Sequence, residues 1–169
     1  MNFKNIKPAE IEGNVFKMIG SGWALISAGK IGSYNMMTAS WGTMGVLWNK
    51  NIFMCFIRPG RYTFEFMQRE KYFTANFLPD KYRDKLNYCG SNSGRDIDKM
   101  KEPGLTPMES GSGAVCFEEA GLILECRKIY SQDLDPGNFL DRSLESNYPL
   151  KDYHRIFAGE IVNCMKKDE

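Results

Sequence analysis

A run of small, hydroxyl-bearing and amide-bearing residues, Tyr34–Gly42, is the part of the sequence best suited to holding a ligand. Side chains of these types let a backbone approach a flat molecule closely and offer amides and hydroxyls to its polar edge, while Trp41 can supply an apolar wall. The alternative is a strand and turn rich in serine and threonine, with Trp41 in the hydrophobic core. Taken by composition alone, the run favours this second interpretation.

A second group, Arg58–Thr63, stands immediately before a predicted helix. The first turn of a helix carries unpaired amides and about half a positive charge, and two arginines lie beside it here. Thr63 is a natural N-cap, because its hydroxyl can accept a hydrogen bond from one of those amides. The group is therefore either a phosphate cradle or a turn with two solvated arginines and an ordinary cap.

The segment Gly90–Lys99 combines glycines and serines with the charges of Arg95 and Lys99. It contains neither the dinucleotide-binding fingerprint G-x-G-x-x-G nor the phosphate loop G-x-x-x-x-G-K-[ST]. The alternative interpretation is a flexible loop that enters a short helix capped by Asp96. This segment alone does not decide between a ligand site and a loop.

His154, the single histidine, lies in Asp152–Arg155 at the start of the last predicted strand. A lone histidine in such a place is more often a hydrogen-bonded structural residue. With no placed nucleophile, Asp152 and His154 do not make a catalytic triad. Cys89 receives no role, because a reactive thiolate depends on surroundings that the sequence does not give.

The elements that must position these residues are mostly strands. Short apolar or alternating runs predict strands over Trp23–Ala28, Asn51–Ile57, Lys71–Phe77, Ala114–Phe117, Gly121–Tyr130 and His154–Met165. Asn51–Ile57 is apolar on both faces, which predicts a central buried strand. The remaining segments are predicted as helices over Thr63–Glu70 and over Pro79–Tyr88 with Gly90 just past its end, a loop over Gly90–Gly113, and a short helix and loop over Asp135–Pro149. This order favours an antiparallel barrel over a doubly wound sheet.

Length and charge narrow the class of protein. The 169 residues fit one domain, 1–169, which can bury roughly 70% of its unfolded surface. The 22 basic and 21 acidic side chains leave a formal net charge of +1, which argues against nucleic acid as a partner. The sequence contains no run of about 18 apolar residues, so no membrane span is predicted.

Cysteine usage indicates a reducing compartment. The five cysteines are widely spaced without a C-x-x-C pair, and the N-terminus does not read as a secretory signal, so we expect a cytoplasmic protein with free thiols. One histidine and scattered cysteines also argue against a metal site. Chemistry, if any, is expected to come from a bound organic cofactor.

Taken together, the groups resemble the flavin reductase-like, FMN-binding split-barrel family, and within it the flavoredoxin-type branch. The resemblance extends from about Val15 to the final strand. Each match is unspecific alone, and their number and order carry the resemblance. The matching segments are Asn35–Trp41, Arg61–Thr63, Phe73–Phe77, Ser93–Lys99, Phe117–Ala120, Tyr153–Arg155 and Gly159–Ile161.

The resemblance implies a mainly β fold, a six-stranded antiparallel Greek-key split barrel, that forms a homodimer with FMN near the subunit interface. It implies that Asn35 and the segment from Met37 through Thr38, Ala39 and Ser40 to Trp41 line the flavin ring. It implies that Arg61 and Thr63 hold the phosphate, that Lys99 adds charge there, and that His154 lies where a nicotinamide or another electron partner approaches.

Several functions stay open at this stage. The resemblance implies an FMN-dependent oxidoreductase using NADH or NADPH and acting on a small-molecule redox substrate. Trp41 and Gly45–Lys50 depart from the Thr-Ala-Ser-Ser and proline-rich pattern of many flavin reductases, which favours a flavoredoxin-like electron carrier reduced by a redox protein. A non-catalytic module for another flat ligand is the third reading; haem would require His154 as its axial ligand.

Overall fold

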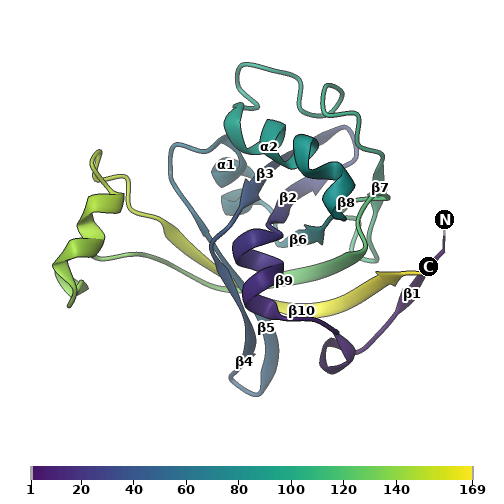
Figure 1. The fold of residues 1–169 in the computed structure, drawn as a ribbon, viewed down its shortest axis with the longest axis horizontal. Helices are drawn as coiled ribbons and strands as arrows, with labels where there is room; N and C mark the ends of the chain where they lie inside the picture. Colours follow the sequence, from purple (N-terminus) through teal and green to yellow (C-terminus); the bar gives the residue numbers. More distant parts are fainter. Residues whose placement is uncertain (1, 169) are drawn as a thin grey trace.

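The computed structural model describes residues 2–168, and strands dominate its regular structure (Figure 1). The strands are β1 (Phe3–Asn5), β2 (Ala24–Lys30), β3 (Ser33–Ala39), β4 (Gly42–Leu47), β5 (Lys50–Ile57), β6 (Tyr72–Phe77), β7 (Pro107–Glu109), β8 (Val115–Phe117), β9 (Leu122–Asp133) and β10 (Arg155–Lys167). The helices are α1 (Tyr62–Arg69) and α2 (Arg83–Ser91), with a π-helical turn η2 (Lys17–Ser21) and short 3-10 turns η1 (Pro8–Glu10), η3 (Asp80–Tyr82), η4 (Pro136–Asn138) and η5 (Arg142–Asn147).

The main sheet is antiparallel throughout and follows the order β3-β2-β6-β9-β10-β5-β4. β1 adds to the C-terminal end of β10, and β7 and β8 form a separate pair. The expected mainly β, antiparallel fold is confirmed. The main sheet holds eight strands rather than six, because β4 extends it beyond β5 and β1 pairs with β10.

A seam runs between β3 and β4, the two ends of this strand order. Only Ser40 and Trp41 separate Ala39, the last residue of β3, from Gly42, the first of β4. Three peptide steps reach at most about 11 Å, so the sheet must curl enough to bring the end of β3 close to the start of β4. The seam between them is where the functional site lies.

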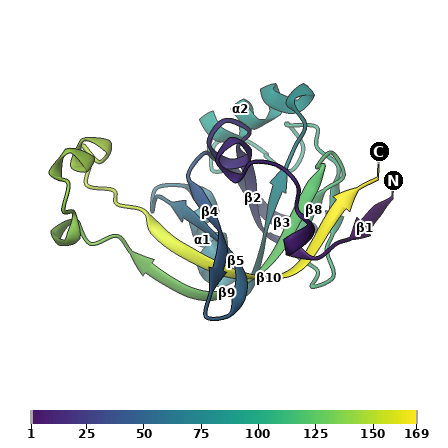
Figure 2. The same cartoon turned by 60° about the horizontal axis from the view of Figure 1, so that its bottom comes forward.

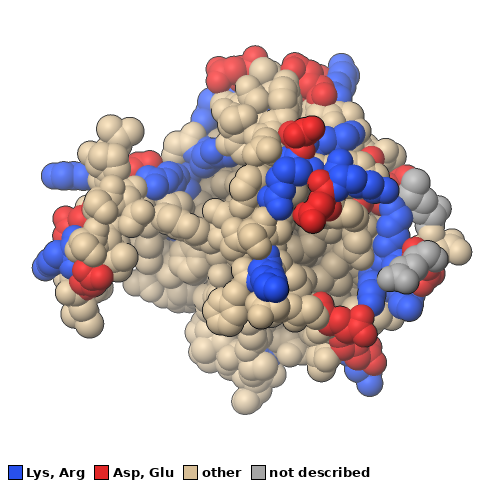
Figure 3. Space-filling view, in the orientation of Figure 1, with Lys and Arg blue, Asp and Glu red and all other residues tan. Residues whose placement is uncertain are grey.

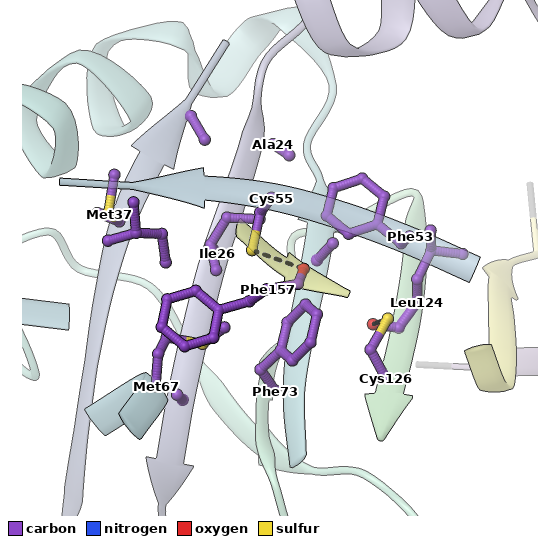
Figure 4. Close-up of a cluster of buried hydrophobic side chains, with 14 of the residues drawn as sticks. Ala24, Ile26, Met37, Phe53, Cys55, Met67, Phe73, Leu124, Cys126 and Phe157 are labelled. Atoms are coloured by element: carbon purple, nitrogen blue, oxygen red, sulfur yellow. Dashed lines mark hydrogen bonds between the residues drawn. The ribbon is translucent and has the colours of Figure 1, made fainter. Parts of the chain in front are cut away.

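An apolar cluster fills the curled interior (Figure 4). Alternate residues of the strands point into it, as the period of two along a strand requires. Phe53 and Cys55 enter from β5, and Phe157 from β10. Met67 of α1 closes one end of the cluster. β5 is an internal strand between β10 and β4, as predicted, and its outward residue Phe56 is half-buried beside the seam.

A second cluster covers the outer face of β2, β6 and β9, under α2 and β8. Between the apolar residues lies a buried polar network. The hydroxyls of Ser27 and Thr74 meet at 2.7 Å and both bond the Val115 carbonyl, while Asn76 accepts from the Phe117 amide at 3.2 Å. These bonds fix β8 on the sheet, which accounts for polar residues inside strands that are buried on both faces.

Both helices differ from the prediction at their ends. Arg61, not Thr63, is the N-cap of α1, so the expected threonine cap is wrong. The Thr63 hydroxyl instead accepts a hydrogen bond from the Asn35 side-chain amide at 2.8 Å, a tertiary contact that the local sequence could not reveal. Gly90 lies within α2 rather than past its end, because α2 starts only at Arg83 and continues to Ser91.

Other departures lie in short elements. Trp23 stands outside β2 with a φ of 69°, and β7 interrupts the predicted loop over Gly90–Gly113. Asp96 caps no helix, since the residues around it form turns. β1, β3, β4 and β7 were not among the predicted strands.

An arm formed by residues 134–154 projects from the barrel between β9 and β10, on the left of Figure 1 and of Figure 2. It carries the predicted short helical turns, η4 and η5. All five cysteines are free, as expected, and all five are buried. Within residues 2–168, no helix is long and apolar enough to cross a membrane.

Candidate functional site

A cavity of about 210 Å³ opens at the seam. β3, the Ser40–Trp41 crossing, the end of β5, the start of α1 and the start of β10 all contribute to it. Its lining residues are Met37, Thr38, Ala39, Ser40, Trp41, Phe56, Arg58, Arg61 and His154. The fold therefore brings together residues that lie more than a hundred positions apart in the sequence.

One wall of this cavity is aromatic. Trp41 is 47% exposed, and its ring lies 5.1 Å from that of His154, tilted by 51°. The interpretation that put Trp41 in the hydrophobic core is therefore wrong, because the two-residue crossing holds it at the surface. The Thr38 hydroxyl is not part of this aromatic wall. It donates a hydrogen bond to the Leu86 carbonyl of α2 at 2.5 Å. Thr38 thus fixes the end of β3 against α2.

A smaller recess of about 100 Å³ adjoins the cavity at the start of α1. Arg61 lines both spaces. The recess is polar, with amides of the first helical turn on one side and a serine-rich loop on the other. Its lining residues are Asn35, Gly60, Arg61, Tyr62, Thr63, Ser91, Asn92, Ser93, Gly94 and Lys99.

Two cations border the recess without a carboxylate partner among residues 2–168. Nη2 of Arg61 is buried and makes no hydrogen bond within the described chain. The Lys99 ammonium is 4% exposed and donates only to backbone carbonyls, of Cys89 at 2.6 Å and Met36 at 3.1 Å. Burial lowers the pKa of Lys99 to about 8; Cys89 opposes this shift and the Arg61 cation adds to it. A buried cation without a counter-ion is costly, so the recess is suited to an anion.

His154 is buried at the other end of the site. Its Nδ1 lies 2.8 Å from the Tyr148 hydroxyl. Burial lowers the pKa of His154 to about 4; the Arg58 cation adds to this, and Asp152 opposes it. Arg58 is itself held by Asp152 at 2.7 Å. The ring is therefore neutral at pH 7 and cannot serve as a cationic group there.

The structure thus divides the sequence-predicted site residues between two adjoining spaces. Met37, Thr38, Ala39, Ser40, Trp41 and His154 line the cavity, Asn35, Thr63 and Lys99 line the recess, and Arg61 joins them. Sequence reasoning missed Phe56 and the Tyr148 partner of His154. The outward alternation of β5 could have indicated Phe56, whereas nothing local connects Tyr148 with His154.

The chain belongs to the flavin reductase-like family: residues 16–169 match the family described as the flavin reductase like domain. No curated protein sequence matches the chain. Solved structures share its fold at low identity. The structure of an FMN-binding protein from Thermus thermophilus with bound p-hydroxybenzaldehyde has a TM-score of 0.70 and 20% identity, over 98% of this chain and 82% of that one.

Two further structures are similar. Flavoredoxin from Methanosarcina acetivorans has a TM-score of 0.68 and 24% identity, over 96% of this chain and 77% of that one. An NADH:FAD oxidoreductase from Streptomyces globisporus, in complex with NAD and FAD fragments, has a TM-score of 0.66 and 16% identity, over 86% and 74%. At these identities the likeness concerns the fold.

The neutrality of His154 predicts a low titration midpoint. In ligand-free protein, the single histidine should give one C2-proton NMR signal that titrates near pH 4 rather than 6.5. Because the folded-state pKa is lowered, the neutral ring's contribution to stability is complete above about pH 6.5 and is lost as the pH falls towards 4.

Arg58→Gln should raise this midpoint, because it removes a neighbouring cation. Arg155→Gln is the matched control, since Arg155 pairs with Asp133 and does not shift the pKa of His154. A wild-type midpoint near 6.5, with circular dichroism showing folded protein, would contradict the assigned environment.

Proposed function

We propose that this protein binds FMN and is an oxidoreductase that receives electrons from NADH or NADPH. The observation that carries the proposal is the buried, unpartnered Nη2 of Arg61, at the junction of an aromatic-walled cavity and a cationic recess. FMN has a flat ring system at one end and a phosphate ester at the other. The aromatic-walled cavity suits the flat ring system, and the cationic recess suits the phosphate.

The recess suits a phosphate because it offers positive charge and hydrogen-bond donors. Arg61 and Lys99 supply positive charge, and the first turn of α1 supplies amides that have no acceptor inside the helix. Thr63 can contribute its hydroxyl proton as well as its backbone amide, because the hydrogen bond from Asn35 uses that hydroxyl only as an acceptor. Burial is the main cause of the lowered pKa of Lys99, and the Arg61 cation adds to it, so a phosphate beside both cations would offset both effects.

The cavity is assigned to the ring system. Met37, Ala39 and Ser40 present the end of β3 along one side, and Trp41 stands at the mouth. Trp41 and His154 together leave a partly open aromatic face, on which a nicotinamide or another electron partner would approach. His154 is neutral there, so it contributes shape and a ring nitrogen rather than charge.

Bound flavin supplies the redox chemistry in such a protein. The chain's own residues supply binding, orientation and electrostatics, which is what the site's side chains can do. No side chain needs to act as a strong acid, in keeping with a single histidine of low pKa. The similar flavoredoxin and NADH:FAD oxidoreductase structures support electron transfer as the reaction class.

The first test is an anaerobic absorbance spectrum of FMN-loaded protein before and after addition of NADH or NADPH. We expect the flavin absorbance to bleach within the mixing time of the assay, because the open face beside Trp41 admits a nicotinamide. Dithionite is the control that shows the bound flavin can be reduced. Flavin that responds to dithionite but not to either nicotinamide would contradict this donor and indicate a redox-protein donor, as in an electron carrier.

The second test concerns the phosphate assignment. Arg61→Ala should weaken FMN binding by about 10- to 100-fold, as expected from the roughly 1.5–3 kcal/mol of a charged hydrogen bond. Riboflavin binding should change little, because riboflavin has no phosphate. Arg69→Ala, at the other end of the same helix, should change neither affinity. Equal losses of FMN and riboflavin in a fluorescence titration would refute the assignment.

We also propose that two copies associate through the arm. Leu140 and Leu150 on the arm are 99% and 83% exposed, and the surface over β4 and β5 is largely free of charge (Figure 3). Burying such residues against a second copy would remove apolar surface from water.

Wild-type protein should therefore sediment at twice the 19.3 kDa chain mass. Leu140→Asp combined with Leu150→Asp should give monomers, because each adds a charge to the interface. Ser146→Asp, an exposed polar position of the same arm, is the control. A monomeric wild type would overturn this proposal.

A further inference from the structure

The loop from Ser91 to Lys99 borders the recess through Ser91, Asn92, Ser93, Gly94 and Lys99. Its first end continues α2, and its second end returns to α2, where Lys99 Nζ donates to the Cys89 carbonyl at 2.6 Å. Both ends are thus fixed to the same helix. Between them, nothing in α2 holds the middle of the loop against α1.

Arg95 makes that contact. Its Nη1 donates to the Gly60 carbonyl at 2.9 Å, and its Nη2 donates to the Glu65 carboxylate. Its guanidinium carbon lies 5.0 Å from the centre of the Tyr62 ring. All three partners belong to the turn and first helical turn that also carry Arg61. A planar guanidinium can make all these contacts at once, and an ammonium group cannot.

The neighbouring Gly94 shows how closely the loop is seated. A Cβ at this position would lie 2.2 Å from Oδ1 of Asn35 and 2.9 Å from the Tyr62 ring. The loop backbone therefore rests directly on β3 and α1. Arg95, the next residue, attaches the loop to α1 beside this contact.

Arg95 itself does not line the recess; it lines a neighbouring polar pocket that shares Asn35, Tyr62, Gly94 and Lys99 with the recess. Its charge is matched by Glu65, and its side chain is 42% exposed. It is therefore placed to act on the recess through the loop and not by touching an anion there.

We infer that Arg95 is a positioning residue for the phosphate group: it holds the Ser91–Lys99 loop closed on the recess, so that Ser91, Asn92, Ser93 and Gly94 stay in its lining. This inference rests on the proposed binding of FMN. The ring end of the ligand lies in the adjoining cavity, to which the loop contributes no residue.

The experiment compares FMN and riboflavin affinities of the full chain by flavin fluorescence. Arg95→Ala should weaken FMN binding about tenfold, because the loop would no longer be held against the recess, with riboflavin binding unchanged within about twofold. Arg95→Lys keeps the charge and loses the planar fork, so it should weaken FMN by about threefold. Arg69→Ala is the matched control: Arg69 also pairs with a carboxylate, of Glu70 at 2.9 Å, and lies 4.6 Å over an α1 ring, Phe66.

The Glu65→Gln variant distinguishes two ways in which Arg95 could affect FMN binding: by holding the loop in place or by its long-range charge. If Arg95 acted only by its field, removal of a nearby negative charge would strengthen FMN binding. If Arg95 holds the loop, loss of its carboxylate partner should weaken FMN binding instead. Thermal unfolding of each ligand-free variant reports the stability of the fold separately.

Weaker FMN binding in Arg95→Ala, Arg95→Lys and Glu65→Gln, with riboflavin unaffected, supports the inference. Wild-type affinity in Arg95→Lys, tighter binding in Glu65→Gln, or equal loss of both ligands would overturn it. Wild-type protein that binds riboflavin and FMN equally would overturn the phosphate assignment and this inference with it. Wild-type protein that binds neither would overturn the proposed function itself.

Discussion

The structure depends on one constraint of connectivity: the chain passes from β3 to β4, the opposite ends of the strand order, through only Ser40 and Trp41. That short crossing makes the sheet curl until the end of β3 and the start of β4 come close, and a seam is left between the two strands. Trp41 lies in this crossing and is 47% exposed. The barrel thereby gains an opening with an aromatic wall at the place where its edges meet.

The second element of the site is electrostatic. Arg61 and Lys99 are held near one another with no carboxylate partner among residues 2–168, an arrangement that reduces the stability of the free protein. The surrounding contacts hold it in place: Asn35 bonds Thr63, Lys99 bonds two carbonyls, and Arg95 ties the loop to α1. An anion in the recess would recover much of that cost, so ligand binding and folding stability are coupled here.

The sequence predicted the strand-rich fold well because the period of two is a local signal. β2, β5, β6 and β9 follow from alternation and bounding turn residues, and both helices follow from the runs that form them. The edge strands β1 and β4 were not predicted, because pairing with β10 and β5, rather than their own composition, makes them strands. The predicted N-cap of α1 was wrong for a similar reason. By sequence the Thr63 hydroxyl could cap the helix, but in the structure it accepts a hydrogen bond from the side chain of the distant Asn35.

By itself the sequence determined the residue types of the site, Asn35 through Trp41, Arg61, Lys99 and His154, and through them the family. It could do so because such motifs are short and contiguous. Only the tertiary structure decided that these motifs form two adjoining spaces joined by Arg61, that His154 is neutral beside Tyr148, and that Arg95 faces α1 rather than the recess. These properties depend on burial and on partners from distant elements, and no local pattern of residues encodes either.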